Sequence, residues 1–445
     1  MKNLKRVFSF KPHYHFFPIT GWINDPNGLI YWKGMYHMFY QYNPKSPSWG
    51  HIHWGHAVSK DLVHWFHLPV ALYPKDERSG IFSGSAVEDN GKLKVIYTFF
   101  RDPEYHKSIK EVQYLAESSD GINFQEYSNN PIISTPPESE VYAFRDPKVR
   151  RSEKGSWEMV LGSGKNGNGR VLFYTSTDLI NWHYRGVLFE GDFAQVFECP
   201  DLISMGRKEV LIYSACTPKV NGTFFVMGTV WDNKLIAENF GMLDVGHDYY
   251  AAQTFFGTER KIVIAWMQNP SNCSYPTQQE GWNGLMAIPR ELHVENNELK
   301  IRPVEEVKQL RINEIVTEVN TKRKKSYDLN IEHNSYEIVC DFSPDVYLRL
   351  HNTWGESVEI STNNSILKVD TRRSGVSEGT IRKVEFKNER QNHLRVFVDS
   401  CSIEIFLNES IVCSFRIHPE YVYNILEFEG GSLHVYKLEN IWLPN

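Results

Sequence analysis

The stretch Tyr36-His37-Met38-Phe39-Tyr40-Gln41 is a short β-rich run, and four similar runs follow it along the chain. These runs are Leu93–Thr98, Trp157–Gly162, Glu209–Ser214 and Lys261–Trp266. Their starts are separated by about 50 to 65 residues, which is enough for four strands and their loops. Five repeats of this size, each ending in a polar turn or a proline, predict a five-bladed β-propeller over residues 1–300.

A second repeated pattern follows three of these runs. Residues 59–65, 118–124 and 176–182 each contain a Ser-x-Asp turn that leads to an aromatic residue. Serine and aspartate are turn formers because their side chains bond to nearby backbone groups. The nearly constant period of this turn supports the division into blades.

Three acidic residues lie beside or near prolines at a constant place in the repeat. Asp25 lies in residues 22–28 (Trp-Ile-Asn-Asp-Pro-Asn-Gly), Asp146 in 144–147 (Phe-Arg-Asp-Pro) and Glu198 in 198–201 (Glu-Cys-Pro-Asp). Each acid precedes the β-rich run of its own repeat by a short strand and a turn. Because the first strand of a propeller blade lines the central channel, we expect these carboxylates to converge at one mouth. A pair of carboxyl groups is what a retaining glycosidase needs.

Together these motifs resemble glycoside hydrolase family 32, the invertases, exo-inulinases and levanases that cleave β-fructofuranosides. Further stretches resemble motifs of that family in the same order, namely 40–44, 49–50, 53–57, 82–85, 251–255 and 289–292. The resemblance points to compact bacterial intracellular β-fructosidases. It implies an all-β chain, with a five-bladed β-propeller followed by a C-terminal antiparallel β-sandwich.

The resemblance also implies a role for each acid. Asp25 is expected to be the nucleophile that forms a covalent fructosyl-enzyme, and Glu198 the acid/base. Asp146 is expected to remain ionised beside Arg145 and to bind two sugar hydroxyls. Taken alone, the stretch around Asp25 would be a capped turn, and Arg145 with Asp146 a local ion pair.

Six further residues match positions around the family's fructose subsite. They are Asn24, Gln41, Trp49, Phe82, Ser83 and Arg145. The amides and the serine would supply hydrogen bonds, and the two aromatic residues an apolar wall for the sugar. Single aromatic residues are more often part of a core, which is the alternative for Trp49 and Phe82.

A second domain is expected after residue 300. Residues 301–312 have helical periodicity, with Val304, Val307 and Leu310 apolar and Pro303 suited to a first turn, and we interpret them as a short helical linker. Alternating β-runs then return, which predicts a β-sandwich over residues 313–445. Within it, residues 399–406 (Asp-Ser-Cys-Ser-Ile-Glu-Ile-Phe) resemble a recognisable segment of the family's C-terminal module.

Composition argues against several partners and compartments. A net charge of −6 argues against nucleic acid, and no basic patch suits an anionic membrane. The first residues lack the apolar core of a signal peptide, and no stretch approaches a membrane-spanning length. Six cysteines without CxxC spacing are typical of reduced thiols. These observations predict a cytoplasmic protein.

No cofactor and no metal are expected. His51 and His53 fall on one face of a strand and could provide two ligands, but no cysteine or acid with metal-binding spacing follows. The glycosidase mechanism also needs no metal. The expected partner is a small sugar or oligosaccharide, and the sequence leaves the oligomeric state open, with a monomer slightly favoured.

The expected activity is that of a retaining, exo-acting β-fructofuranosidase. It would release terminal fructose from sucrose, and also from raffinose and inulin-type fructans. A fructosyltransferase and a sucrose-6-phosphate hydrolase are alternatives on the same scaffold, and the acidic motifs do not choose among them. A non-catalytic carbohydrate-binding relative is disfavoured because all three acids are present.

Overall fold

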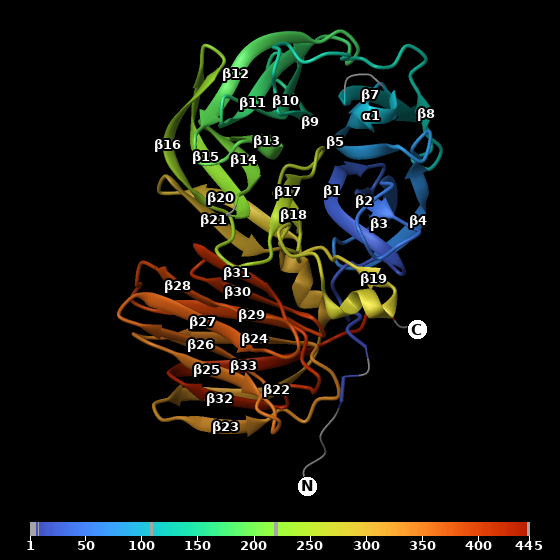
Figure 1. The fold of residues 1–445 in the computed structure, drawn as a ribbon. Coiled ribbons are helices and arrows are strands. Elements are labelled where there is room, and N and C mark those ends of the chain that lie inside the picture. The colour runs from blue at the N-terminus through green and yellow to red at the C-terminus, as the bar shows by residue number, and fades with distance from the viewer. Residues whose placement is uncertain (1–5, 8, 107–109, 218–220, 443–445) are drawn as a thin grey trace.

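The computed structural model describes residues 6–7, 9–106, 110–217 and 221–442. Within these residues, five small sheets occupy 21–303 and two six-stranded sheets occupy 311–438. Figure 1 shows the small sheets arranged around a centre, with the two larger sheets stacked below them. The predicted propeller and sandwich are thus confirmed. In the described part of the chain, no helix has both the length and the apolar content of a membrane crossing.

Each blade is an antiparallel sheet whose strands follow one another along the chain. Blade I contains β1 (Gly21–Trp32), β2 (Met35–Asn43), β3 (His53–Ser59) and β4 (Trp65–Leu72). Blade II contains β5 (Ser79–Asp89), β6 (Lys92–Arg101), β7 (Glu111–Ser118) and β8 (Gln125–Glu126), with the short helix α1 (Pro103–His106) before β7. Blade III contains β9 (Ala143–Arg151), β10 (Trp157–Lys165), β11 (Asn168–Ser176) and β12 (His183–Gly191).

The last two blades have the same plan. Blade IV contains β13 (Glu198–Met205), β14 (Lys208–Cys216), β15 (Asn221–Trp231) and β16 (Lys234–Met242). Blade V contains β17 (Tyr250–Thr254), β18 (Lys261–Trp266), β20 (Arg290–Glu295) and β21 (Glu298–Pro303). The 3-10 helix η1 (Pro276–Glu280) and the short strand β19 (Trp282–Asn283) lie between β18 and β20.

The five β-rich runs of the sequence all lie in the second strands, β2, β6, β10, β14 and β18. Their apolar residues are buried between blades, as the repeated pattern predicts. The first strands, β1, β5, β9, β13 and β17, lie nearest the propeller centre in Figure 1, and each contacts the next around the ring. Residues at the starts of first strands are therefore brought together.

Blade V closes the ring onto blade I through backbone hydrogen bonds. The N–H of Tyr31 donates to the carbonyl of Phe256 at 2.8 Å, and the N–H of Phe256 donates to the carbonyl of Leu29 at 2.9 Å. In addition, β19 pairs in parallel with the start of β1, next to Gly21. The segment 22–28, which contains Asp25, is thus held from both sides by the closure.

The Ser-x-Asp turns join the third and fourth strands of blades I, II and III. In each, the serine hydroxyl donates to the aspartate two residues later, which in turn accepts backbone N–H groups. The residue after the aspartate has positive φ, at 69° for Leu62, 79° for Gly121 and 66° for Leu179. This tight turn explains why the motif repeats in the sequence.

The connection to the second domain is shorter than a regular helix. Strand β21 ends at Pro303, a 3-10 helix η2 spans Glu305–Leu310, and β22 begins at Arg311. Val307 and Leu310 are buried against the propeller core, which accounts for the apolar spacing in the sequence.

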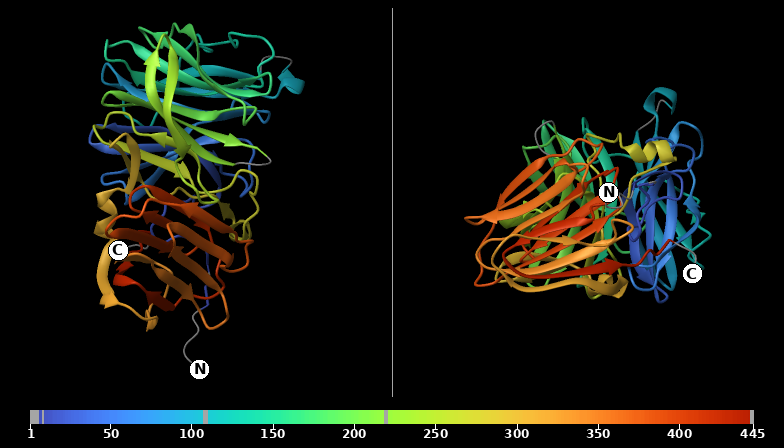
Figure 2. Two further views of the ribbon diagram at one scale, coloured as in Figure 1. Left: turned by 90° about the vertical axis from the view of Figure 1, so that its left-hand side faces the viewer. Right: turned by 90° about the horizontal axis from the view of Figure 1, so that it is seen from below.

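Two six-stranded sheets form the C-terminal sandwich. The first has the order β22 (Arg311–Thr321), β33 (Gly431–Leu438), β24 (Tyr336–Phe342), β29 (Asn392–Asp399), β30 (Ser402–Leu407) and β31 (Ile411–Arg416). The second has the order β23 (Lys325–Asp328), β32 (Ile425–Glu429), β25 (Tyr347–His351), β26 (Ser357–Asn363), β27 (Ile366–Arg373) and β28 (Ile381–Glu385). Their inner faces enclose one apolar core. The views in Figure 2 show the sandwich packed against one side of the propeller.

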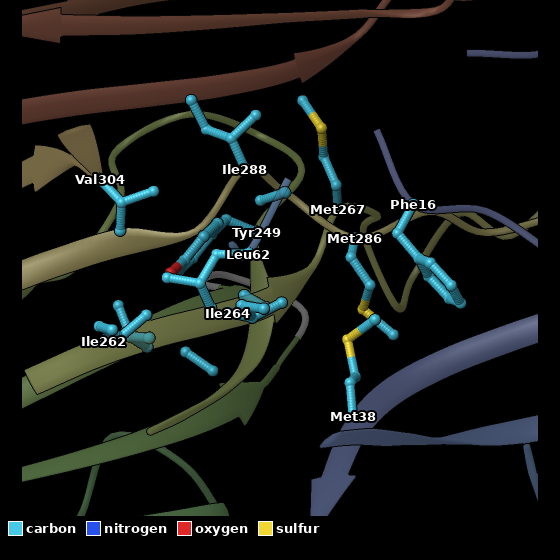
Figure 3. Packing of buried hydrophobic residues seen from close by; sticks show 14 of the residues in the cluster. Phe16, Met38, Leu62, Tyr249, Ile262, Ile264, Met267, Met286, Ile288 and Val304 are labelled. Carbon is cyan, nitrogen blue, oxygen red and sulfur yellow. The ribbon is translucent and has the colours of Figure 1, made fainter. Parts of the chain in front are cut away.

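One continuous apolar cluster joins the two domains. Figure 3 shows part of it, where Phe16, Met38, Ile264 and Met286 pack together. The same cluster includes Phe397, Phe406 and Val412 of the sandwich, all nearly fully buried. Burial of apolar area at this interface stabilises one fixed placement of the two domains.

Buried charges also cross the interface, and two of the acids come from the segment 399–406 that the sequence singled out. The imidazole of His15 lies 2.8 Å from Asp399 and 2.9 Å from Glu404. Arg290 of blade V lies 2.7 Å from Glu404 and 2.9 Å from Asp244. All of these side chains are fully buried, so loss of one partner leaves an uncompensated charge.

This network predicts a pH-dependent stability. Burial disfavours the charged imidazole, but the hydrogen bonds to Asp399 and Glu404 outweigh it and raise the pKa of His15 to about 9. A raised pKa stabilises the folded protein below pH 6.5, and this contribution is lost as the pH rises through about 9. It amounts to at most about 3 kcal/mol. We expect the melting temperature to fall between pH 6.5 and 9.

The His15→Gln variant should melt at a lower temperature at pH 6.5 and should lack this component of the pH dependence. The matched control is His183→Gln, since His183 is exposed on β12. A His15→Gln variant with the full pH dependence of the wild type would assign the effect to another group. Differential scanning calorimetry across the pH range makes the measurement.

Candidate active site

A bulge interrupts the ladder between the first and second strands of every blade. Two residues of the first strand stand out of the ladder in each case, namely Asn24-Asp25, Phe82-Ser83, Asp146-Pro147, Cys199-Pro200 and Ala251-Ala252. Bulges of this kind turn side chains in a new direction and occur beside active sites. Three of these residues have positive φ, at 64° for Asp146, 48° for Cys199 and 57° for Ala251. This strained backbone directs the acidic motifs into the channel.

A cavity of about 520 Å³ opens at the place where the bulges meet. Asp25, Asp146 and Glu198 all line it. It is also lined by five of the six residues expected around the sugar, namely Asn24, Gln41, Trp49, Phe82 and Arg145. The sixth, Ser83, does not line it but donates a hydrogen bond to Asp25 at 2.6 Å. All nine expected residues are thus brought to one place.

Asp25 is held by donors from three blades. Ser83 and the amide of Gln41 donate to Oδ2 at 2.6 and 3.1 Å, and the amide of Asn24 donates to Oδ1 at 3.1 Å. The thiol of Cys199 donates to Oδ2 at 3.3 Å. Burial raises the pKa of Asp25, and the hydrogen bond from Ser83 opposes this effect. The donors orient the carboxylate and support its ionised form.

The surroundings of Asp146 differ from those expected, in which the neighbouring Arg145 keeps this carboxylate ionised. The guanidinium turns toward other acids, and its Nε lies 4.0 Å from Asp146. Burial raises the pKa of Asp146 to about 7, although Arg145 and the N–H of Cys199 act against it. The cost of desolvation, which adjacency in the sequence does not reveal, is the reason. Burial in the cavity therefore favours the neutral form of this carboxyl group, in opposition to Arg145 and the Cys199 N–H.

Arg145 forms the centre of an ion-pair network that includes Glu198. Its Nη2 donates to Oε1 of Glu198 at 2.7 Å, and its Nη1 donates to Glu111 at 2.8 Å. Glu111 also accepts the backbone N–H of Phe144 at 2.6 Å, which anchors the network to β9. The hydroxyl of Tyr250 donates to Oε2 of Glu198. Both oxygens of Glu198 are thus bound, and its orientation is fixed.

Aromatic rings form the walls of the cavity. Trp49, 57% exposed, contacts Phe82 edge to face with 6.2 Å between ring centroids. Phe82 stacks on Phe100 at 4.6 Å. Trp22 and Trp266 meet on another part of the lining, with centroids 5.6 Å apart. Such faces suit the C–H surfaces of a sugar ring.

The sequence analysis missed several residues of this cavity. They are Trp22, Phe100, Lys110, Glu111, Tyr250, Trp266, Pro270 and Cys273. Tyr250 directly precedes the motif at 251–255 and could have been found from it. Glu111 carries no local signal, because it is buried at the start of β7 and meets Arg145 only through the fold. Among the described residues, no three histidine, cysteine or acidic side chains are grouped to hold a metal ion.

Known proteins share this arrangement of domains. The model of the "Glycosyl hydrolases family 32 N-terminal domain" matches residues 15–303, and that of the family's C-terminal domain matches residues 306–441. A sucrose-6-phosphate hydrolase of Escherichia coli is 37% identical over 94% of this chain and 91% of its own length. A raffinose invertase of Escherichia coli is 35% identical over 94% of this chain and 91% of its own length.

A solved structure shows the same fold. The β-fructofuranosidase BmSUC1 of Bombyx mori superposes with a TM-score of 0.86 at 30% identity, over 98% of this chain and 95% of its own. The two family models together cover nearly the whole described chain, including the propeller and the sandwich. This protein is therefore a hydrolase that belongs to glycoside hydrolase family 32.

Proposed function

We propose that this protein is a retaining, exo-acting β-fructofuranosidase that hydrolyses terminal β-D-fructofuranosides such as sucrose, raffinose and inulin-type fructans. The observation that carries the proposal is the meeting of Asp25, Asp146 and Glu198 around one cavity with Arg145 at its centre. Relatives named as an invertase and as a β-fructofuranosidase support the substrate class.

In the first step, Asp25 attacks the anomeric carbon of fructose while Glu198 donates a proton to the leaving oxygen. The bond to the leaving sugar breaks, and a fructosyl–Asp25 ester forms. In the second step, Glu198 takes a proton from water, which attacks the ester and releases fructose with retention. The donors from Ser83, Gln41 and Asn24 orient Asp25 for the attack.

Asp146 supports the first step by binding sugar hydroxyls beside the anomeric carbon. It touches the same thiol, that of Cys199, as Asp25 does, so it lies on the nucleophile side of the cavity. Negative charge on Asp146 stabilises the ring as it gains positive charge in the transition state.

Substitution of Asp25 or Glu198 tests their proposed roles as nucleophile and acid/base. We expect Asp25→Asn and Glu198→Gln to lower turnover of sucrose by several orders of magnitude, because each removes a group that acts in bond making. Circular dichroism should show an unchanged fold. The control is Asp232→Asn, an exposed acid in the turn between β15 and β16, which should keep wild-type rates. A fast, folded Asp25 or Glu198 variant would remove that residue from its role.

The acid/base can be tested by choice of leaving group. Glu198→Ala should flatten the alkaline limb of the pH–rate profile, since no group is left to lose the catalytic proton. It should slow sucrose far more than a fructoside with a good leaving group, and azide should partly restore the second step. Equal slowing of both substrates, with an unchanged profile, would pass the role to another carboxylate.

Sucrose 6-phosphate is a second candidate substrate, favoured by Lys110. This side chain lines the cavity, with its ammonium 5.7 Å from the ring centroid of Phe100. The backbone at Lys110 is held by the hydrogen bond from the N–H of Arg101 to the carbonyl of Lys110, at 2.8 Å. A lysine beside the aromatic wall could bind a phosphate on the leaving sugar. The relative named sucrose-6-phosphate hydrolase agrees with this substrate.

Lys110→Met separates the two substrates. We expect the ratio of kcat/KM for sucrose 6-phosphate to that for sucrose to fall about tenfold or more, because a charged hydrogen bond is lost. Lys60→Met, a change at an exposed residue after β3, should leave the ratio unchanged. An unchanged ratio in Lys110→Met would mean that Lys110 does not bind phosphate.

The sugars released from sucrose distinguish hydrolysis from the alternative activity, fructosyl transfer. A hydrolase releases glucose and fructose from sucrose in equal amounts, whereas a fructosyltransferase releases an excess of glucose. The cytoplasmic location and the monomeric state remain predictions from the sequence.

A further inference from the structure

We propose that the C-terminal sandwich is part of the catalytic machinery, because it positions Tyr250 against Glu198. This inference rests on the proposed role of Glu198 as acid/base. It assigns a task to the sandwich and to a tyrosine that the acidic motifs do not include. Three connected observations carry it.

The first observation is the contact between Tyr250 and Glu198. Tyr250 is the first residue of β17, is 4% exposed, and donates its hydroxyl to Oε2 of Glu198. The other oxygen, Oε1, is taken by Arg145. Tyr250 therefore decides where Oε2 points. Burial raises the pKa of Tyr250 well above its ordinary value, so the phenol stays a donor across the working pH range.

The second observation is the way in which the preceding segment is held. Residues 245–248 lie along β31, the edge strand of the first sandwich sheet. The N–H of Val245 donates to the carbonyl of Val412 at 2.8 Å, and the N–H of His247 donates to the carbonyl of Ser414 at 3.0 Å. The segment is thereby bonded to the edge of the sandwich sheet, and it ends only two residues before Tyr250.

Two buried aspartates strengthen the same attachment. Asp244 accepts the N–H of Ser414 at 3.0 Å and its hydroxyl at 2.7 Å. Asp248 accepts the N–H of Arg416 at 2.8 Å and the hydroxyl of Tyr275 at 2.8 Å. Both aspartates are 2% exposed. Buried carboxylates with this many donors are costly to displace, so the segment is fixed on β31.

The third observation is the close approach at Gly246. A Cβ atom there would lie 2.3 Å from both the N and the O of Ser414. Only glycine allows the two backbones to meet at this distance. On the other side of Tyr250, the N–H of Ala251 donates to Ser214 of blade IV at 2.9 Å. Tyr250 thus lies between an anchor on the sandwich and an anchor on the blade that carries Glu198.

A hydrogen bond from a neutral phenol to a carboxylate favours the ionised carboxylate. Other charged or titratable groups also act on Glu198 and Tyr250. They are Arg145, Asp25, Asp146, Cys199 and Cys216. None of them is changed by removal of the Tyr250 hydroxyl. Loss of the phenol should therefore move the alkaline limb of the pH–rate profile to higher pH and should loosen the orientation of Glu198.

The test is a double-mutant cycle between the phenol and the sandwich contact, read from pH–rate profiles of sucrose hydrolysis. In Tyr250→Phe the alkaline midpoint should rise by about one pH unit or more, with a fall in kcat. Gly246→Ala should move the midpoint in the same direction, because the segment is pushed away from β31. The double variant should shift no further than Tyr250→Phe alone, since both changes act through one contact.

Tyr174→Phe is the control, because the hydroxyl of Tyr174 is buried in blade III and has no hydrogen-bond partner among the residues that the structure describes. It should leave the midpoint where it is. If Gly246→Ala does not fold, Asp248→Asn takes its place, since it keeps the volume but loses one acceptor. The role of the sandwich would be overturned if the midpoint shifts of the two single variants added up in the double variant. It would also be overturned if Tyr250→Phe shifted the midpoint and Gly246→Ala did not.

A comparison of Tyr250→Phe with Glu198→Ala distinguishes failure of this positioning role from failure of the proposed function. An unchanged midpoint in Tyr250→Phe, with a flattened limb in Glu198→Ala, would overturn the positioning role and leave Glu198 as the acid. An unchanged limb in Glu198→Ala would overturn the proposed function itself.

Discussion

The crowding of carboxylates around one guanidinium is the constraint on which the rest of the structure depends. Glu111, Asp146 and Glu198 lie about Arg145, and Asp25 lies beyond the thiol of Cys199. Buried charges of like sign are costly unless donors and a counter-ion compensate them. The propeller meets this cost by directing hydroxyl, amide, thiol and backbone donors into one channel. In the proposed function, the same crowding stabilises the positive charge that develops on the sugar in the transition state.

The repeated bulge shows how a repetitive fold supports a site without symmetry. Every blade carries the same irregularity, yet each contributes a different chemical group to the cavity. Blade I supplies Asp25, blade III Asp146, blade IV Glu198 and blade V Tyr250. Blade II supplies donors and an aromatic wall. Closure of the ring by strands from both ends of the propeller makes these positions mutually dependent.

The sandwich is bound to the propeller by two kinds of interaction with different effects. The apolar cluster buries area and is tolerant of small shifts. The fully buried ions of Arg290, Glu404 and His15 demand matched geometry, and so they fix which strand faces which loop. This explains why the recognisable segment 399–406 belongs to the sandwich while its acids contact the N-terminal part of the chain and blade V.

The sequence by itself determined the five blades and the second domain, and it singled out three acids that line one cavity, because these features depend on local periodicity and short motifs. Through family-like stretches it also indicated five further residues that line this cavity and Ser83, which bonds to Asp25. Only the tertiary structure showed that Arg145 turns from Asp146 toward Glu111 and Glu198, and that burial raises the pKa of Asp146 to about 7. It likewise placed Tyr250 on Glu198 and residues 245–248 on β31. Desolvation and contacts between distant strands arise from packing, which leaves no signature at neighbouring positions in the sequence.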